Sequence, residues 1–143
     1  MSHYTLDTAQ AIQVSSLLNN DAYANIAAVN AAVTTVDLQD WLKERALIVV
    51  TNEDAGSNTT VAVQHSDTTT DGDFAAVAAS ILTDPVTGDN DTLANLNTAG
   101  VKTVAVDLRR CRRYLRIQLA TELGAASAVS AMLVGQYSES PTS

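Results

Sequence analysis

Apolar residues recur at every second position along several short segments of this 143-residue chain. The clearest segment is Tyr114 to Thr121, in which Leu115, Ile117 and Leu119 share one parity. Successive side chains of a β-strand point to opposite faces, so a period of two places these residues on one face. Each such segment is therefore expected to form a strand that buries one side in a core.

Turn-forming Asn, Asp and Gly residues separate the segments with this character. The other expected strands are 11–18, 36–39, 46–51, 59–65, 102–108 and 125–137. Segments 46–51 and 59–65 are joined by a short polar loop and are expected to pair as a hairpin. Residues 24–36 mix helix-favouring Ala with strand-favouring Val and Thr, and the run Val33 to Val36 favours a strand.

No long amphipathic helix alternates with these segments, which argues against a parallel α/β fold. Aromatic residues make up only 4% of the chain, so the core is expected to consist of aliphatic side chains, with Trp41 as a core or interface anchor. The expected fold is all-β: an antiparallel, jelly-roll-like β-sandwich of about seven to nine strands.

The length fits one domain spanning residues 1–143, with an N-terminal arm at 1–10 and a loose tail at 138–143. Residues 83–100 are expected to form a long surface loop, and long loops are often functional. No signal peptide and no apolar run of membrane-spanning length is recognised.

The formal net charge is −8, which argues against general nucleic-acid binding. Six of the eight basic residues nevertheless lie between Lys102 and Arg116. The cluster Arg109 to Arg113 is compatible with a solvated turn paired to nearby acids, a protein contact or a phosphate contact. The candidate partner-binding residues are Arg109, Arg110 and Arg112 in this cluster, and Asp84, Asp89 and Asp91 in the long loop.

The sequence contains few residues that could act in catalysis. The only cysteine, Cys111, has no evident base, and a lone thiol indicates a reducing compartment. His65 is interpreted as a hydrogen-bonded residue at a strand end, with a metal ligand or pH switch as the alternative. The acidic runs 67–73 and 89–91 indicate turns or, alternatively, calcium loops. The sequence predicts no enzyme, no cofactor and no metal site.

Several short signatures follow one another in an order that resembles a known group of proteins. They are Val36-Asp37-Leu38, Ala46 to Val50, Val61 to Asp67, Phe74 to Ala79, Ile81-Leu82, Arg113 to Ile117 and Ala125 to Val134. This order is similar to that of small virion proteins of tailed bacteriophages, across about residues 33–137. The resemblance implies a jelly-roll-like sandwich that acts as a capsid decoration or cement protein.

The expectation that follows is a structural protein on the capsid surface, made in the host cytoplasm. Its partner would be the major capsid protein, whose neighbouring subunits it would brace, and it would form a dimer or trimer there. Neither nucleic acid nor membrane is an expected partner. The alternatives are a neck or tail structural protein and a carbohydrate-binding host-adhesion module.

Overall fold

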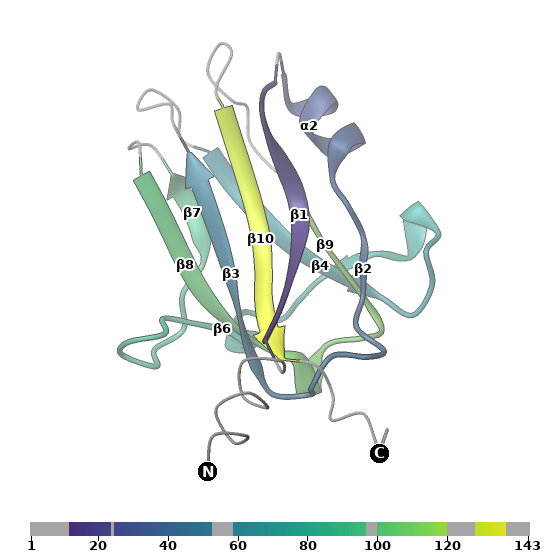
Figure 1. Cartoon of the computed structure of the whole chain (residues 1–143), viewed down its shortest axis with the longest axis vertical. Helices are drawn as coiled ribbons and strands as arrows, with labels where there is room; N and C mark the ends of the chain where they lie inside the picture. Colours follow the sequence, from purple (N-terminus) through teal and green to yellow (C-terminus); the bar gives the residue numbers. More distant parts are fainter. Residues whose placement is uncertain (1–11, 24, 53–58, 97–99, 120–127, 137–143) are drawn as a thin grey trace, which may run out of the picture.

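A computed structural model describes residues 12–23, 25–52, 59–96, 100–119 and 128–136. Strands dominate these residues (Figure 1). The strands are β1 (Ile12–Ala22), β2 (Val36–Asp37), β3 (Arg45–Asn52), β4 (Thr59–Ser66), β5 (Ala75–Ala76), β6 (Leu82–Thr83), β7 (Leu93–Leu96), β8 (Gly100–Asp107), β9 (Tyr114–Leu119) and β10 (Ala128–Gln136). The helical elements are α2 (Ile26–Ala32) and three 3₁₀ turns, η1 (Asp71–Asp73), η2 (Ala79–Ile81) and η3 (Leu108–Arg110).

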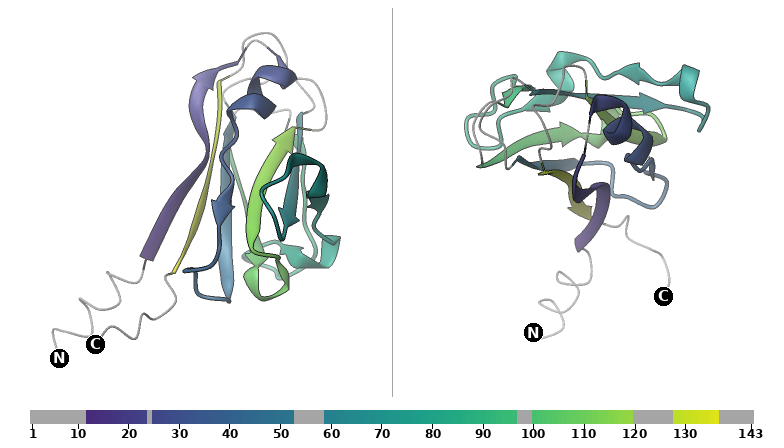
Figure 2. Two further views of the ribbon diagram at one scale, coloured as in Figure 1. Left: turned by 90° about the vertical axis from the view of Figure 1, so that its right-hand side faces the viewer. Right: turned by 90° about the horizontal axis from the view of Figure 1, so that it is seen from above.

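The strands form two antiparallel sheets that lie face to face, as the left view of Figure 2 shows. One sheet has the order β1-β10-β3-β8-β6, and the other has the order β2-β9-β4-β5 with β7 also paired to β4. The pairings are nested, since β1 pairs with β10, β2 with β9, β3 with β8 and β4 with β7. Nested pairs that wrap into two sheets define a jelly roll, so the expected all-β sandwich is confirmed.

The core lies between the sheets and is aliphatic, as the sequence predicts. The residues predicted to share the inner side of β9, Leu115, Ile117 and Leu119, are all buried. Strand β3 contributes Ile48, and β10 contributes Leu133, and neither has any exposed surface. Alternating burial of this kind fixes the register, because a slip by one residue would turn every apolar side chain to the opposite face.

Trp41 closes the core at the end where η3 lies. Its side chain is 2% exposed, so it is a core residue in this chain. The ring packs against Gly135 of β10: a Cβ added there would lie 2.9 Å from Trp41 Cε3 and Cζ3 and 3.2 Å from the Cβ of Ala46. The missing side chain of Gly135 therefore makes the space that the indole ring fills.

Residues 26–32 correct one sequence expectation, because they form helix α2 where a strand was expected. Asn25 caps the helix by accepting a hydrogen bond from the backbone N–H of Ala28 at 2.9 Å. Val29 is the buried residue of this helix. Alanines and a good N-cap decide the local structure, and only the last part of the segment, Val36–Asp37, pairs as β2.

Two further expectations, the hairpin of segments 46–51 and 59–65 and the long loop at 83–100, were wrong. Strands β3 and β4 do not form a hairpin, because β3 pairs with β10 and β8 while β4 lies in the other sheet. Residues 83–100 are not one loop, because they contain β7 and the isolated bridge between Thr83 and Asn90. The predicted arm at 1–10 and the tail at 138–143 lie outside the described residues.

Candidate interaction surface

The outer side of the β1-β10-β3-β8 sheet is the first unusual surface. Cross-strand register aligns Val14, Val134, Leu47 and Ala105 in one row across these four strands. The adjacent row consists of Ser16, Met132, Val49 and Thr103. We call these two rows, with Ile12, Gln136, Ser130, Thr51 and Val101 beside them, the uncharged face.

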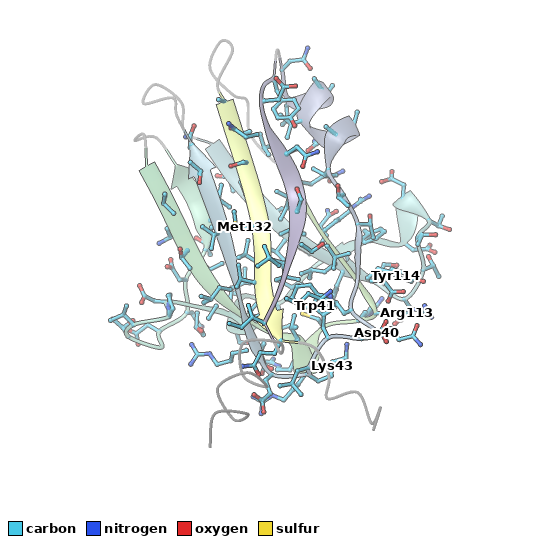
Figure 3. All side chains as sticks on the ribbon, in the orientation of Figure 1. Asp40, Trp41, Lys43, Arg113, Tyr114 and Met132 are labelled. Atoms are coloured by element: carbon cyan, nitrogen blue, oxygen red, sulfur yellow. The ribbon has the colours of Figure 1, made fainter. Side chains whose placement is uncertain are left out.

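No charged residue occurs in the uncharged face, although 17% of the chain is charged. Several of its apolar side chains are open to solvent: Ile12 is 54% exposed, Val14 59% and Val101 67%. Met132 is 39% exposed and lies near the centre of the face, where Figure 3 labels it. Exposed apolar side chains gathered on a face without charge often mark a functional surface.

Sequence reasoning missed this surface, although a signal for it was present. Residues 12–20, 46–51 and 128–136 contain no charged residue at either parity. An ordinary sandwich strand alternates apolar inward residues with polar outward ones. The absence of charge from both parities of long stretches of three strands that later prove adjacent therefore indicates an outer face without charge.

The predicted arginine cluster forms the connection between β8 and β9, at one end of the sandwich. Arg109 binds Asp107 through two hydrogen bonds, with Nε at 2.9 Å from Oδ1 and Nη2 at 3.1 Å from Oδ2. Arg110 instead binds Ser80 of η2, donating to its carbonyl oxygen at 3.2 Å and to its Oγ at 2.9 Å. The first two arginines thus differ, because only Arg109 has a carboxylate partner among the described residues.

The next two arginines tie the connection to neighbouring elements. Arg113 forms two hydrogen bonds with Asp37 of β2, at 3.1 and 2.9 Å, and this bonding lowers the pKa of the Asp37 carboxyl. The Arg112 Nε lies 3.8 Å from Asp67 Oδ2, and both side chains are exposed. Exposed pairs of this kind contribute little stability, so their main effect is to orient side chains.

Arg116 has a different environment, since only 9% of this residue is exposed. Its Nε donates to Gln64 Oε1 at 2.8 Å and its Nη1 donates to Asp71 Oδ1 at 2.6 Å. Its guanidinium also lies 4.0 Å from the centre of the Phe74 ring, a cation–π contact. Arg116 therefore holds the segment 71–74 onto the outer side of β4 and β9.

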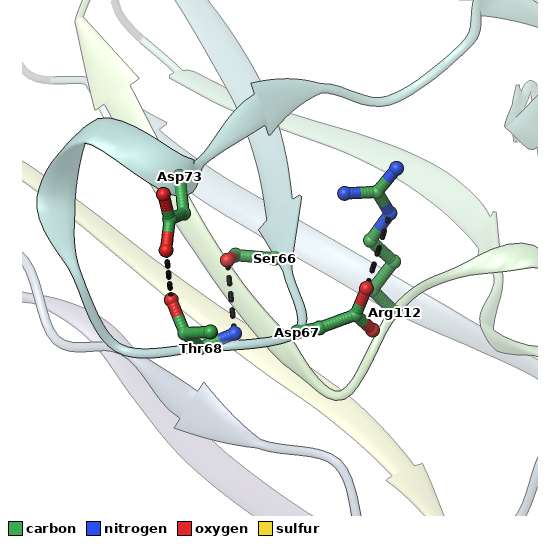
Figure 4. Close-up of a pocket in the computed structure, with 5 residues that line it drawn as sticks. All are labelled: Ser66, Asp67, Thr68, Asp73 and Arg112. Atoms are coloured by element: carbon green, nitrogen blue, oxygen red, sulfur yellow. Dashed lines mark hydrogen bonds and ion pairs between the residues drawn. The ribbon is translucent and has the colours of Figure 1, made fainter.

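Two polar hollows lie beside the arginine cluster. The first has a volume of about 230 Å³ and is lined by Ser66, Asp67, Thr68, Asp73 and Arg112 (Figure 4). Thr68 Oγ1 donates to Asp73 Oδ2 at 2.6 Å, and the Thr68 N–H donates to Ser66 Oγ at 3.0 Å. Its polar groups already bond to one another, so this hollow is an ordered turn with little capacity left for a ligand.

The second hollow has a volume of about 180 Å³, and we call it the arginine notch. The polar residues that line it include Arg45, Ser80, Thr83, Asp107 and Arg109. Arg45 and Asp107 are cross-strand partners in β3 and β8, and they occupy the row next to Leu47 and Ala105. The notch therefore borders the uncharged face at one end.

The predicted acidic residues lie in the turn between β6 and β7. Asp84 accepts hydrogen bonds from the N–H groups of Val86 and Thr87, which lower the pKa of its carboxyl. The Asp89 carbonyl accepts from the Asp84 N–H at 2.8 Å. Asp91 pairs with Lys102 at 2.7 Å. Asp84 and Asp89 bracket Gly88, which lines the notch, so the structure brings this turn to Arg109 but not to Arg112.

The side chains of Cys111 and His65 both form hydrogen bonds within the fold. The Cys111 thiol donates to the Asp107 carbonyl oxygen at 3.5 Å, and burial raises its pKa to about 11. His65 Nδ1 accepts from the Arg112 N–H at 3.2 Å, and burial lowers the pKa of the ring. The interpretation of His65 as a hydrogen-bonded strand-end residue is confirmed.

Cys111 is expected to react slowly with thiol reagents in the native protein. Raising the pKa from 9.0 to about 11 lowers the thiolate fraction at pH 8 about 100-fold, and the thiolate is the reactive form. The rate of reaction with DTNB at pH 8 should therefore be at least about 100-fold lower in buffer than in concentrated urea. Equal rates in the two solvents would show that the thiol is neither buried nor protonated as described.

Among the described residues, no three His, Cys, Asp or Glu side chains come together as metal ligands. In the acidic run 67–73, Asp67, Asp71 and Asp73 each contact a different partner: Arg112, Arg116 and Thr68. No helix within the described ranges is long and apolar enough to span a membrane. No model of a known protein family matches the chain, and no curated protein matches it significantly.

Proposed function

We propose that this chain is a structural subunit of a bacteriophage particle, a decoration protein that binds the outer capsid shell and braces neighbouring capsid subunits. The observation that carries the proposal is the uncharged face. A protein with a net charge of −8 that leaves most of the outer side of four adjacent strands without charge has a surface suited to burial against another protein. The jelly-roll topology and the resemblance in strand order also support a virion role.

The size of the uncharged face indicates how strongly one copy binds. The uncharged face covers five to seven residues of each of four strands, a length of about 18 Å, and the strands lie about 4.8 Å apart, so the face presents roughly 350 Å². A standard protein interface buries about 800 Å² per partner, so a single copy would bind weakly through this face alone. Attachment through several linked copies, as in a dimer or trimer on the shell, would multiply that affinity.

The carbohydrate-binding alternative has less support. Sugar-binding sites commonly use exposed aromatic rings, whereas Trp41 and Tyr23 are buried here. Phe74 is half-buried beneath the Arg116 guanidinium. Within the described part of the chain, no exposed aromatic platform is present. A neck or tail location remains the alternative within the virion, and imaging of particles separates it from the capsid surface.

The proposal predicts that Val14→Glu reduces the occupancy of the protein on capsid particles about tenfold or more. The substitution would bury an unpaired carboxylate in the contact, and each 1.4 kcal/mol lost corresponds to about a factor of ten. Val86→Glu is the matched control, because Val86 is 90% exposed and lies in the turn between β6 and β7. Occupancy is measured by quantitative electrophoresis of purified particles.

Val86→Glu should bind like the unsubstituted protein, and both variants should unfold at the same urea concentration as that protein. Equal occupancy for Val14→Glu and Val86→Glu would contradict a role for the uncharged face. A chain that never co-purifies with particles would contradict the virion role itself.

A further inference from the structure

Two guanidinium groups at the arginine notch, that of Arg45 in its lining and that of Arg110 beside it, have no carboxylate partner among the described residues. Arg45 donates from Nη2 to Thr83 Oγ1 at 3.2 Å, and this is its only recorded side-chain bond within the described residues. Arg110, beside the notch, bonds only to Ser80 there. By contrast, Arg109, Arg112, Arg113 and Arg116 each have an aspartate within 4.0 Å.

The hydroxyl partners orient these two guanidinium groups without neutralising them. A guanidinium group carries several N–H donors in a planar fork, and most of those on Arg45 and Arg110 are left unused by the recorded bonds. Asp107 is already bound by Arg109, and Asp84, in the turn that reaches the notch, accepts from the N–H groups of Val86 and Thr87. Neither carboxylate bonds to Arg45 or Arg110 among the described residues, so donors on both arginines are left for an added anion.

An oxyanion is the ligand that this arrangement suits. Arginine forks bind carboxylates through paired, charge-assisted hydrogen bonds, which are about twice as strong as neutral ones. The position of the notch favours a protein carboxylate, since Arg45 borders the uncharged face, on which a protein partner is proposed to lie. Interfaces commonly combine an apolar centre with a polar rim, and arginine is enriched in them.

We propose that the arginine notch receives an Asp or Glu side chain of the protein that docks on the uncharged face, with Arg45 and Arg110 as its ligands. This inference deepens the proposed function and rests on it for the identity of the partner. The carboxylate would set the orientation and register of the docked partner, while the apolar contact supplies most of the buried area.

The probe for this site is a blocked tetraglutamate peptide, titrated into the isolated full chain at low ionic strength. Arginine Nε–Hε signals are followed by ¹⁵N-edited NMR, with a blocked tetraglutamine peptide as the neutral control. Saturable shifts of the Arg45 and Arg110 signals are expected with tetraglutamate only. Arg45→Gln should weaken this binding at least about tenfold, whereas Arg113→Gln, whose arginine is paired with Asp37, should leave it unchanged.

Other arms of the experiment identify the source of the anion. Inorganic phosphate is expected to bind more weakly than tetraglutamate, and equal or tighter phosphate binding would overturn the assignment to a protein carboxylate. Arg45 signals that shift with protein concentration alone would identify a second copy of this chain as the source. Arg45→Lys keeps the positive charge but lacks the planar guanidinium group, so it should bind tetraglutamate with intermediate affinity. Binding by this variant would show that the loss in Arg45→Gln does not come from unfolding.

Absence of saturable shifts at about 10 mM peptide, or identical shifts in Arg45→Gln, would overturn the inference. Such a result leaves the proposed function standing if Val14→Glu still reduces particle occupancy. Conversely, tetraglutamate binding together with unchanged Val14→Glu occupancy would contradict the proposed docking face, while the carboxylate site would remain.

Discussion

Replacing Trp41 with alanine is expected to reduce the free energy of unfolding by about 3–5 kcal/mol, the range observed when large buried side chains are truncated. Trp41 is 2% exposed and fills the end of the core beside Gly135, which has no side chain to take its place. The surrounding strands belong to a register fixed by many cross-strand pairs, so they can collapse only partly into the cavity. Urea denaturation followed by far-ultraviolet circular dichroism measures the loss.

Trp41→Phe is the conservative comparison, because it keeps a flat ring in the same space. Its cost should be clearly smaller than that of the alanine variant. If Trp41→Ala unfolded at the same urea concentration as the original chain, the indole ring would not be part of the core. If the total stability is no larger than this loss, Trp41→Ala will be largely unfolded.

Gly135→Ala is expected to destabilise the protein by about 1–3 kcal/mol, although alanine is normally neutral or favourable in place of glycine. The added Cβ would lie 2.9 Å from two atoms of the Trp41 ring, which is too close for unstrained packing. Gly72→Ala is the matched control, because a Cβ there meets nothing within 4 Å. Gly72→Ala should leave the urea midpoint unchanged or raise it slightly.

The two substitutions at this contact should also be coupled. In a Trp41→Ala background the two closest contacts are gone and only the Ala46 Cβ at 3.2 Å remains, so Gly135→Ala should cost much less. A double-mutant cycle then gives a coupling energy close to the cost of Gly135→Ala in the original chain. Simple additivity of the two effects would show that the strain at Gly135 arises somewhere other than Trp41.

The sequence predicts the sheets well where alternation is strong. Leu115, Ile117 and Leu119 in β9, and Val129, Ala131 and Leu133 in β10, are buried on the parity that their spacing indicates. Alternation is a local property, however, and says nothing about which strand lies beside which. The short connection between β3 and β4 predicted a hairpin, but in the nested pairing of a jelly roll these two strands lie in opposite sheets.

Helix α2 shows a second limit of local reasoning. The helix and strand propensities of residues 24–36 are balanced. The choice of a helix depends on Asn25 as its N-cap and on the burial of Val29 in the core. The cap can be recognised in the sequence, because Asn precedes an alanine-rich run. A cap alone does not stabilise so short a helix, however, and the packing of Val29 in the core follows only from the fold.

For the candidate interaction surface, the sequence showed where basic residues cluster along the chain but not which of them lie together in the fold. The arginine cluster was evident, yet its members separate in three dimensions into arginines paired with an aspartate, such as Arg113, and Arg110, which has no carboxylate partner among the described residues. Arg45, remote in sequence, joins them only because β3 pairs with β8. The uncharged face depends on the same pairing, so neither surface could be assembled before the topology was known.

Electron cryomicroscopy of the phage particles to which this chain is proposed to belong tests the proposed function most directly. We expect copies of the jelly roll on the outside of the capsid, with Val14 and Met132 covered by a neighbouring subunit and an acidic side chain beside Arg45. Copies attached through another surface, with the β1-β10-β3-β8 sheet facing solvent, would contradict it.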